Sequence, residues 1–386
     1  MHRSRAAVAA AFATQGLVFI SLTTRLPRFQ RRWDLSELEV SVLLLMMVLL
    51  AGVGSVVAER LARRRESATM LRLALLTMAI AVPVLVATPA LAGFVAGLAV
   101  YGVALGVVDA TTNMQAVALE HAWRRPILPS FHGAWTFGGI VGAGLALGTA
   151  DVPLGALAVL GVVPLAVAAA PFLRRTSGWS VAVEHVDVPW RPIVLVGLGM
   201  VLFYMVDTAA QTWGPTFLEQ TFPTPDALVA LAVFPYLIAS LALRLAGDSL
   251  VARFGVVPVL RVGGVVGCAA LVTVVFAPAW SVAVAGFTLL GAGVAVIAPL
   301  SFSAAARIAG STGTNLDDDA RMLRVDAVIA RFNQFNYVGA LLGAVLTGVV
   351  GSGNLRFGFA VPMVLILAII PLARAFAGDA VPQGNL

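Results

Sequence analysis

Long apolar runs alternate with short polar stretches along nearly the whole chain. A helix that crosses the hydrocarbon core of a bilayer needs about 20 mostly apolar residues. Twelve runs reach this length, beginning near positions 6, 39, 69, 91, 127, 153, 193, 227, 256, 280, 325 and 356. The pattern therefore predicts an all-α integral membrane protein with twelve transmembrane helices. The first run resembles a signal peptide, but we interpret it as a retained helix because eleven further spans follow it.

The longest polar gap in the middle of the chain runs from Arg174 to Pro192 and leaves six predicted spans on each side. Two six-helix halves joined by a linker are the architecture of many secondary transporters. We therefore predict two pseudo-symmetric six-helix bundles, over residues 1–175 and 192–386, joined by a cytoplasmic linker over residues 176–191.

Composition agrees with a membrane protein and excludes several other classes. Of 386 residues, 60% are hydrophobic and 11% are charged, whereas soluble domains have roughly 45–50% apolar and about 25% charged residues. The net charge of +6 comes from arginines in short clusters, without the aromatic interleaving typical of single-strand binding. One cysteine and four histidines offer little for a metal, and the motifs H-E-x-x-H and G-x-S-x-G are absent. We expect no enzyme, no cofactor, no metal and no nucleic-acid partner.

The arginines also predict the orientation, because cytoplasmic loops retain positive charge. With the N-terminus inside, the loops after even-numbered spans are cytoplasmic and carry most of the arginines. The opposite side carries only Arg25, Arg28, Arg31, Arg32 and Arg356. We therefore predict both termini in the cytoplasm and a location in the cytoplasmic (inner) membrane.

Two inner loops at corresponding positions of the halves repeat a charge pattern. GSVVAERLARRRESATMLR follows the second span, and RLAGDSLVARFGVVPVLR follows the eighth. Both resemble the signature loop of the major facilitator superfamily, G-x-x-x-D-R-x-G-R-R, although the first has glutamate and alanine at the acid and glycine positions. The resemblance implies charge pairs that break when the halves rock, so we predict gating roles for Glu59, Arg60, Arg63, Arg244, Asp248 and Arg253.

Further segments resemble the fucose-permease-like branch of that superfamily. They include RLPRFQRRWDLSELEVSVLL, VVDATTNMQAVALE, PSFHGAWTFGGIVGA, MVDTAAQTWGPTFL and FNQFNYVGALLGAVLTG. The resemblance implies proton-coupled transport of a sugar-like solute. One departure argues against fucose itself: the sugar-transporting members have an acid near the outer end of the first helix, where this chain has Thr23 close to Arg25.

Two carboxylates lie well inside predicted spans. Asp109 is in the inner half of the fourth span, and Asp207 is in the seventh, away from either end. An ionised aspartate at the centre of a membrane helix costs roughly 2.5–3.5 kcal/mol, so such residues face a wet cavity, find a partner or bind a proton. We predict that Asp109 and Asp207 couple transport to protons. A structural hydrogen bond to a neighbouring helix is the alternative.

Polar residues in the same spans are candidates for contact with the solute. Asn113 follows Asp109 by one helical turn, on the same face. Trp213 can stack on a sugar or anchor its helix at the membrane interface. The full set of predicted substrate-binding residues is Asn113, Gln115, Gln15, Trp213, Asn333, Asn336 and Tyr337. Polar contacts between helices are the alternative explanation for the amide-rich group of the eleventh span.

Glu120 and His132 lie near the inner ends of the fourth and fifth spans and are candidates for gating. The more conservative expectation is that Glu120 or Gln115 holds His132 through a hydrogen bond between helices. Glycine pairs at small-xxx-small spacing, such as Gly102 and Gly106, indicate close helix packing.

Together these features predict a monomeric secondary active transporter that moves a small, sugar-like solute by alternating access, with proton coupling through Asp109. The expected partners are the small-molecule substrate, the proton and the lipid bilayer. The alternative is a proton-antiport exporter of a drug or secondary metabolite. The polar segment from Asp317 to Asp326 is predicted to be a cytoplasmic insertion.

Overall fold

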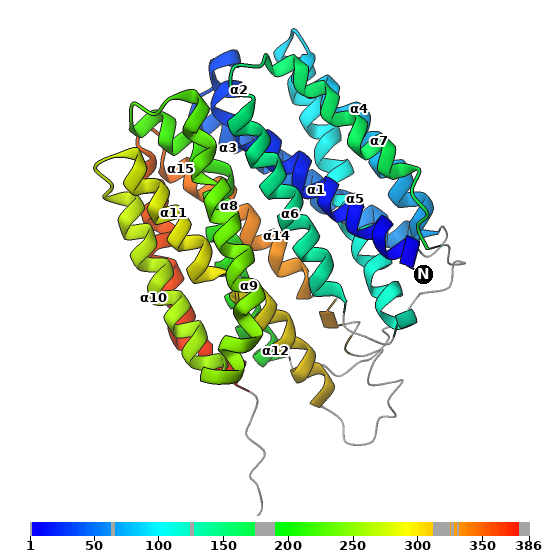
Figure 1. The fold of residues 1–386 in the computed structure, drawn as a ribbon, viewed down its shortest axis with the longest axis vertical. Coiled ribbons are helices and arrows are strands. Elements are labelled where there is room, and N and C mark those ends of the chain that lie inside the picture. The colour runs from blue at the N-terminus through cyan, green and yellow to red at the C-terminus, as the bar shows by residue number, and fades with distance from the viewer. Residues whose placement is uncertain are drawn as a thin grey trace, which may run out of the picture.

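The computed structural model describes residues 2–62, 66–123, 127–173, 190–311 and 332–377, together with Val325, Val328 and Ile329. Within these residues the chain is a bundle of long, apolar helices (Figure 1). Nine stretches are long and apolar enough to cross a membrane, and two shorter apolar stretches cover residues 154–168 and 334–350. With helix α6 these account for twelve spans, which begin close to the positions that the sequence predicts.

The first half of the chain forms seven α-helices and one 3₁₀ helix. Their order is α1 (His2–Thr23), α2 (Leu26–Trp33), α3 (Glu37–Ala62), α4 (Ser67–Ala87), α5 (Leu91–Trp123), α6 (Leu128–Gly148), η1 (Leu154–Gly161) and α7 (Val162–Ala168). Helix α1 packs along α6, and α5 packs against both α3 and α4. The predicted sixth span is the pair η1–α7, which begins as a 3₁₀ helix after Pro153.

The second half repeats the arrangement with more interruptions. Its elements are α8 (Trp190–Thr221), η2 (Asp226–Ala232), α9 (Phe234–Phe254), α10 (Val256–Val275), α11 (Trp280–Val294), α12 (Ile297–Ser311), α14 (Gln334–Leu341), η3 (Leu342–Leu346), α15 (Thr347–Val350), α16 (Leu355–Leu365), η4 (Ile366–Ala368), α17 (Ile369–Leu372) and η5 (Ala373–Phe376). Helix α8 packs on α14, and α11 packs on α9 and α10. The turn η3 is π-helical.

The two ends of the bundle differ in structure. The short helix α2 lies at one end, and the N-terminus lies toward the other (Figure 1). We call the first the α2 end; it also carries the loops before η1 and η2. Two predicted segments fall almost entirely outside the described residues: the linker at 176–191, which divides the halves, and the polar segment 317–326. Both stay predictions.

Large apolar side chains on the outer faces of the helices are exposed, as a bilayer requires. Ile80 is 67% exposed, Leu245 is 78% exposed and Val262 is 62% exposed. A contiguous apolar surface of this kind is rare in soluble monomers. Lipid tails solvate it at no hydrophobic cost, so helix association depends on close packing instead.

Close packing is visible where α3 crosses α5. A methyl group built on Gly106 of α5 would collide with the backbone carbonyl of Ala51 in α3. Gly102, one turn earlier, lies against Met47 of the same helix. This pair of glycines therefore lets the two backbones meet, and it positions the next turn of α5, which carries Asp109.

Candidate functional site

A cavity lies between the two halves of the bundle, with about 1130 Å³ of space free of protein atoms, its open mouth included. Helices α1, α3, α5 and α6 form one wall, and α8, α9, α14 and η3 form the other. The polar and aromatic residues that line it are Phe12, Gln15, Phe19, Asp109, His132, Trp135, Phe203, Tyr204, Asp207, Thr208, Gln211, Thr212, Arg244, Asn336 and Tyr337.

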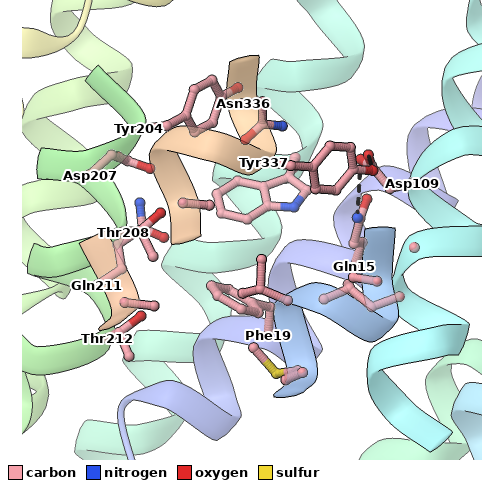
Figure 2. Close-up of a pocket in the computed structure, with 18 of the residues that line it drawn as sticks. Gln15, Phe19, Asp109, Tyr204, Asp207, Thr208, Gln211, Thr212, Asn336 and Tyr337 are labelled. Carbon is pink, nitrogen blue, oxygen red and sulfur yellow. Dashed lines mark hydrogen bonds between the residues drawn. The ribbon is translucent and has the colours of Figure 1, made fainter. Parts of the chain in front are cut away.

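Asp109 is bonded on both carboxylate oxygens. The phenol of Tyr337, from α14, donates to Oδ2 at 2.5 Å, and Nε2 of Gln15, from α1, donates to Oδ1 at 3.3 Å (Figure 2). Nδ2 of Asn113 lies 3.5 Å from Oδ1 and donates to the Asp109 backbone carbonyl at 2.9 Å. Asp109, Gln15 and Tyr337, which the sequence singled out separately, therefore form one network that links the two halves. Asn113 supports this network from outside the set of cavity-lining residues.

Asp207 lies on the other side of the cavity, on α8 (Figure 2). The phenol of Tyr236, from α9, donates to its Oδ1 at 2.5 Å. Gln211, one helical turn later, is also a hydrogen-bonding neighbour. Thr208 and Gln211 line the cavity beside it, because positions separated by three or four residues share one face of a helix. Each half of the protein thus supplies one carboxylate, each bound by a tyrosine.

Arg244 lines this cavity as well, and its position corrects the sequence prediction that placed it in the inner loop. Its Nε donates to the carbonyl of Ala295 at 3.3 Å, and its Nη1 donates to Oγ1 of Thr136 at 3.2 Å. The guanidinium carbon lies 5.6 Å from the ring centre of Phe203. The motif-like spacing misplaced this residue because α9 continues well beyond it, to Phe254.

His132 lines the cavity between two phenylalanine rings. Its ring centre lies 5.4 Å from that of Phe12 and 6.4 Å from that of Phe302, which belongs to the other half. The expected hydrogen bond of His132 with Glu120 or Gln115 stays a prediction; Glu120 accepts the backbone N–H of Ile127 at 2.7 Å. His132 therefore contacts the opposite half through aromatic packing.

Two residues predicted to bind substrate lie away from the cavity. Gln115 is buried and bonds Oγ of Ser67 at 2.8 Å and both backbone groups of Leu173 at 3.0 Å, so it ties α5 to neighbouring segments of its own half. Trp213 is fully buried, and its indole N–H donates to the carbonyl of Ala344 at 2.7 Å. That contact corrects both expectations for Trp213, solute stacking and interfacial anchoring.

Of the amides predicted in the eleventh span, the structure brings Asn336 to the cavity wall beside Tyr337. Asn333 precedes α14 and is not among the residues that line the cavity. Because α14 is helical, only one face of this polar stretch can meet the cavity.

At the end opposite α2, the predicted gating residues Asp248 and Arg253 do not form the expected clamp within the described chain. Asp248 and Arg253 are exposed on α9, and among the described residues neither makes an ion pair within 4.0 Å. The guanidinium carbon of Arg253 lies 5.2 Å from the ring centre of the adjacent Phe254. Glu59 and Arg60 are exposed near the end of α3, and Arg63 lies outside the described residues.

Ion pairs between the halves lie instead at the α2 end. Arg31 of α2 pairs with Glu219 at the end of α8, and it also pairs with Asp226 of η2 at 2.7 Å. Close by, Oγ1 of Thr216 donates to Oε1 of the buried Gln30 at 3.3 Å. Sequence reasoning gave these residues no role. The cluster of arginines in LPRFQRRW on a short amphipathic helix was the available signal.

The position that departs from the sugar-transporting pattern does not reach the central cavity. Oγ1 of Thr23 lies 3.5 Å from the Ile20 carbonyl. The guanidinium of Arg25 bonds the carbonyl of Ser21 at 2.8 Å and Oγ1 of Thr149 at 2.6 Å, which fastens the C-terminal end of α1 to the end of α6. Burial and the charge of Arg28 lower the pKa of Arg25 to about 10, still well above neutrality.

A helical membrane protein whose two halves enclose a polar cavity has the architecture of a secondary transporter. No group of three or more potential metal-ligating side chains occurs among the residues that the structure describes. What the site offers is two partnered carboxylates, one guanidinium, several amides and hydroxyls, and aromatic walls. The carboxylates can bind protons. The amides and hydroxyls can hydrogen-bond a solute, and the aromatic rings can stack on it.

Comparisons with known proteins agree with this class. An uncharacterised MFS-type transporter of Yersinia pestis is 25% identical over 375 residues, which cover 95% of this chain and 94% of that protein. The crystal structure of the nucleoside transporter NupG matches with a TM-score of 0.70 at 14% identity, over 97% of this chain and 98% of that one. No protein-family model matches the chain.

The crystal structure of FucP in the outward conformation also matches, with a TM-score of 0.65 at 15% identity, over 97% of this chain and 98% of that one. At such identities the structural likeness establishes the fold. The chain has the fold of the major facilitator superfamily, and its sequence is similar to that of an MFS-type transporter. The fucose-permease-like branch, predicted from sequence segments, is one of several structural neighbours.

Proposed function

We propose that this protein moves a small, polar, hydroxylated solute across the cytoplasmic membrane by alternating access, coupled to protons through Asp109. The observation that carries the proposal is the bonding of Asp109, whose carboxylate receives Tyr337 from the opposite half and Gln15 from its own. A carboxylate in this position responds both to protons and to the relative position of the halves.

Proton binding changes what this carboxylate can do. An ionised carboxylate only accepts hydrogen bonds, whereas a protonated one has an O–H to donate and a weaker acceptor. Hydrogen bonds to charged groups are worth about 1.5–3 kcal/mol, more than neutral ones. Protonation of Asp109 therefore loosens its bond to Tyr337, and with it one contact that holds the halves together. This coupling is the proposed link between proton and conformation.

The proposed solute follows from the groups that line the cavity. Gln15, Gln211 and Asn336 present amides, and Thr208 and Thr212 present hydroxyls. Amides donate and accept hydrogen bonds, as hydroxyl groups on a solute require. The aromatic residues Phe19 and Trp135 can pack on the apolar face of a ring.

In the proposed cycle, the α2 end faces outward, in accord with the arginine distribution. The ion pairs of Arg31 with Glu219 and Asp226 then close the outer side. Opening toward the outside requires these contacts to break. They therefore serve as the outer latch of the proposed cycle.

Proton flux in proteoliposomes tests the proposal. A panel of sugars, polyols and hydrophobic amines is applied to the wild type, to Asp109→Asn and to a matched control, Asp34→Asn. Asp34 is an exposed acid in the left-handed conformation that asparagine tolerates. We expect a solute class that drives proton movement in the wild type and control but not in Asp109→Asn, which should keep solute counterflow. Intact coupling in Asp109→Asn would exclude the proton-carrier role.

A second candidate function is export of an amphipathic drug or metabolite by proton antiport. The aromatic residues that line the cavity outnumber the amides, which favours it. The same panel separates the two: hydrophobic amines that drive protons in the opposite direction to solute movement support export, and sugars or polyols support the first proposal.

A further inference from the structure

Arg244 is a cation inside the central cavity. Among the residues that the structure describes, its partners are the carbonyl of Ala295, the hydroxyl of Thr136 and the ring of Phe203. No described acid lies within 4.0 Å of its nitrogens. A charged group inside a membrane protein is costly unless it faces water, a partner or a ligand.

The guanidinium retains bonding capacity on the cavity side. Arginine has five N–H donors in a planar fork, and the hydrogen bonds to Ala295 and Thr136 use one on Nε and one on Nη1. Its Nη2 makes no hydrogen bond to a described residue and is not sealed off from solvent, and Arg244 lines the cavity. Unused N–H groups are therefore open to a molecule in the cavity. Phe203 covers one face of the guanidinium, which fixes the plane of the fork.

Asp207 is the acid whose charge acts on Arg244 through space, yet it is bonded elsewhere. Its Oδ1 receives the phenol of Tyr236 at 2.5 Å. The other carboxylate, Asp109, is held by Tyr337 and Gln15. Both acids of the cavity thus have neutral hydrogen-bond donors as their direct partners, and Arg244 lacks a direct anionic partner.

From this arrangement we infer that the transported solute carries an anionic group, such as a carboxylate, which the fork of Arg244 binds. This inference rests on the proposed function and narrows its substrate class to hydroxylated organic acids. Arginine binds carboxylates through two parallel N–H···O bonds, and such charge-assisted bonds are about twice as strong as neutral ones. The hydroxyl groups of the same solute then meet amides such as Gln15 and Gln211, which line the same cavity.

The position of Arg244 gives its ligand a further effect. Arg244 belongs to α9 and its Thr136 partner to α6, so this hydrogen bond crosses between the halves. An anion bound to the guanidinium of Arg244 changes the hydrogen bond between Arg244 and Thr136, which lies where the halves meet. Solute binding can therefore influence which conformation the transporter adopts.

Equilibrium binding to the purified protein tests the inference with matched probes. D-gluconate and D-sorbitol differ only in a carboxylate against a hydroxymethyl group at one carbon, and D-glucuronate and D-glucose make the same comparison in ring form. Affinities are measured for the wild type, Arg244→Gln, Arg244→Lys and the control Arg261→Gln. Arg261 also donates to a backbone carbonyl, Ile370 at 3.4 Å, but does not line the cavity.

We expect at least one acid to bind the wild type tenfold or more tightly than its neutral partner, a difference of about 1.4 kcal/mol. Arg244→Gln should lose this preference, Arg244→Lys should keep part of it, and Arg261→Gln should keep it all. Three results would overturn the inference. The neutral solutes bind the wild type as tightly as the acids do, the preference for the acid survives in Arg244→Gln, or neither acid binds. Proton flux driven by a neutral solute would still support the proposed function in each of those cases.

Discussion

The phenol of Tyr337 and the carboxylate of Asp109 are joined by a 2.5 Å hydrogen bond that connects α14 to α5 across the central cavity. The two residues are 228 positions apart in the chain. Because they come from different halves, any rocking motion that separates α14 from α5 breaks the bond. In the proposed cycle, this contact is where the protonation state of Asp109 acts on the relative position of the two bundles.

Replacement of Tyr337 by phenylalanine should uncouple solute transport from the proton gradient while solute binding is retained. The ring remains, but Asp109 loses a hydrogen bond worth about 1.5–3 kcal/mol. We expect uptake driven by a pH gradient to fall about tenfold, while solute counterflow changes little. Tyr204→Phe is the matched control, because Tyr204 lines the cavity while the described side chains that donate to the Asp109 carboxylate are Tyr337, Gln15 and Asn113. Equal ratios of gradient-driven uptake to counterflow in both variants would contradict the coupling role of Tyr337.

Loss of the Arg31 ion pairs should open the α2 end. Exposed pairs are worth about 0.2–1 kcal/mol each, and Arg31→Gln removes its contacts to both Glu219 and Asp226. We expect roughly a several-fold larger population in which the halves are apart at this end. High salt should act in the same direction in the wild type, because it screens exposed charges.

Pulsed electron paramagnetic resonance can measure that population. Spin labels are placed at Leu38→Cys in α3 and Ala227→Cys in η2, both exposed at the α2 end, with the single native cysteine changed by Cys268→Ser. Arg28→Gln serves as control, since Arg28 donates to the Val152 carbonyl within its own half. A distance distribution that is unchanged in Arg31→Gln would exclude the latch.

Trp213 should contribute to the stability of the fold, and Trp135 should contribute to solute binding. Trp213→Phe removes the hydrogen bond to the Ala344 carbonyl, at a cost of about 1 kcal/mol, and should lower the melting temperature by a few degrees with solute affinity unchanged. Trp135 lines the cavity, so Trp135→Phe should change solute affinity more than stability. Thermal unfolding and equilibrium binding measure both effects on each variant. A change in solute affinity in Trp213→Phe, without a loss of stability, would mean that Trp213 belongs to the binding site.

Close packing of α3 and α5 makes a prediction about two glycines. Gly106→Ala forces a methyl group onto the Ala51 backbone, and overpacking of this kind costs roughly 1–3 kcal/mol or more. Gly52→Ala is the matched control, since a methyl group there meets no atom within 4 Å. We expect thermal unfolding to show a loss of stability in Gly106→Ala and none in Gly52→Ala. Equal stability of the two variants would mean that the helices can separate slightly without cost.

The sequence by itself determined the membrane spans, because the length of apolar runs reflects the thickness of the bilayer and needs no knowledge of tertiary contacts. It also singled out Asp109 and Asp207, since a carboxylate in an apolar run is unusual wherever the helix packs. Gln15, Asn336 and Tyr337 were expected near the cavity from polarity alone, and all three line it.

Only the tertiary structure decided which polar residues meet. Gln115 and Trp213 are as conspicuous in sequence as Gln15, yet the rotation of their helices turns them toward Leu173 and Ala344 instead of the cavity. Arg244 fits a loop motif in sequence, yet it faces the cavity because α9 extends past it. Arg31 is distant in the chain from its partners Glu219 and Asp226, and the pattern of charges along the sequence does not predict that they pair. Hydropathy depends on each residue alone, whereas a site depends on helix rotation and on which helices become neighbours.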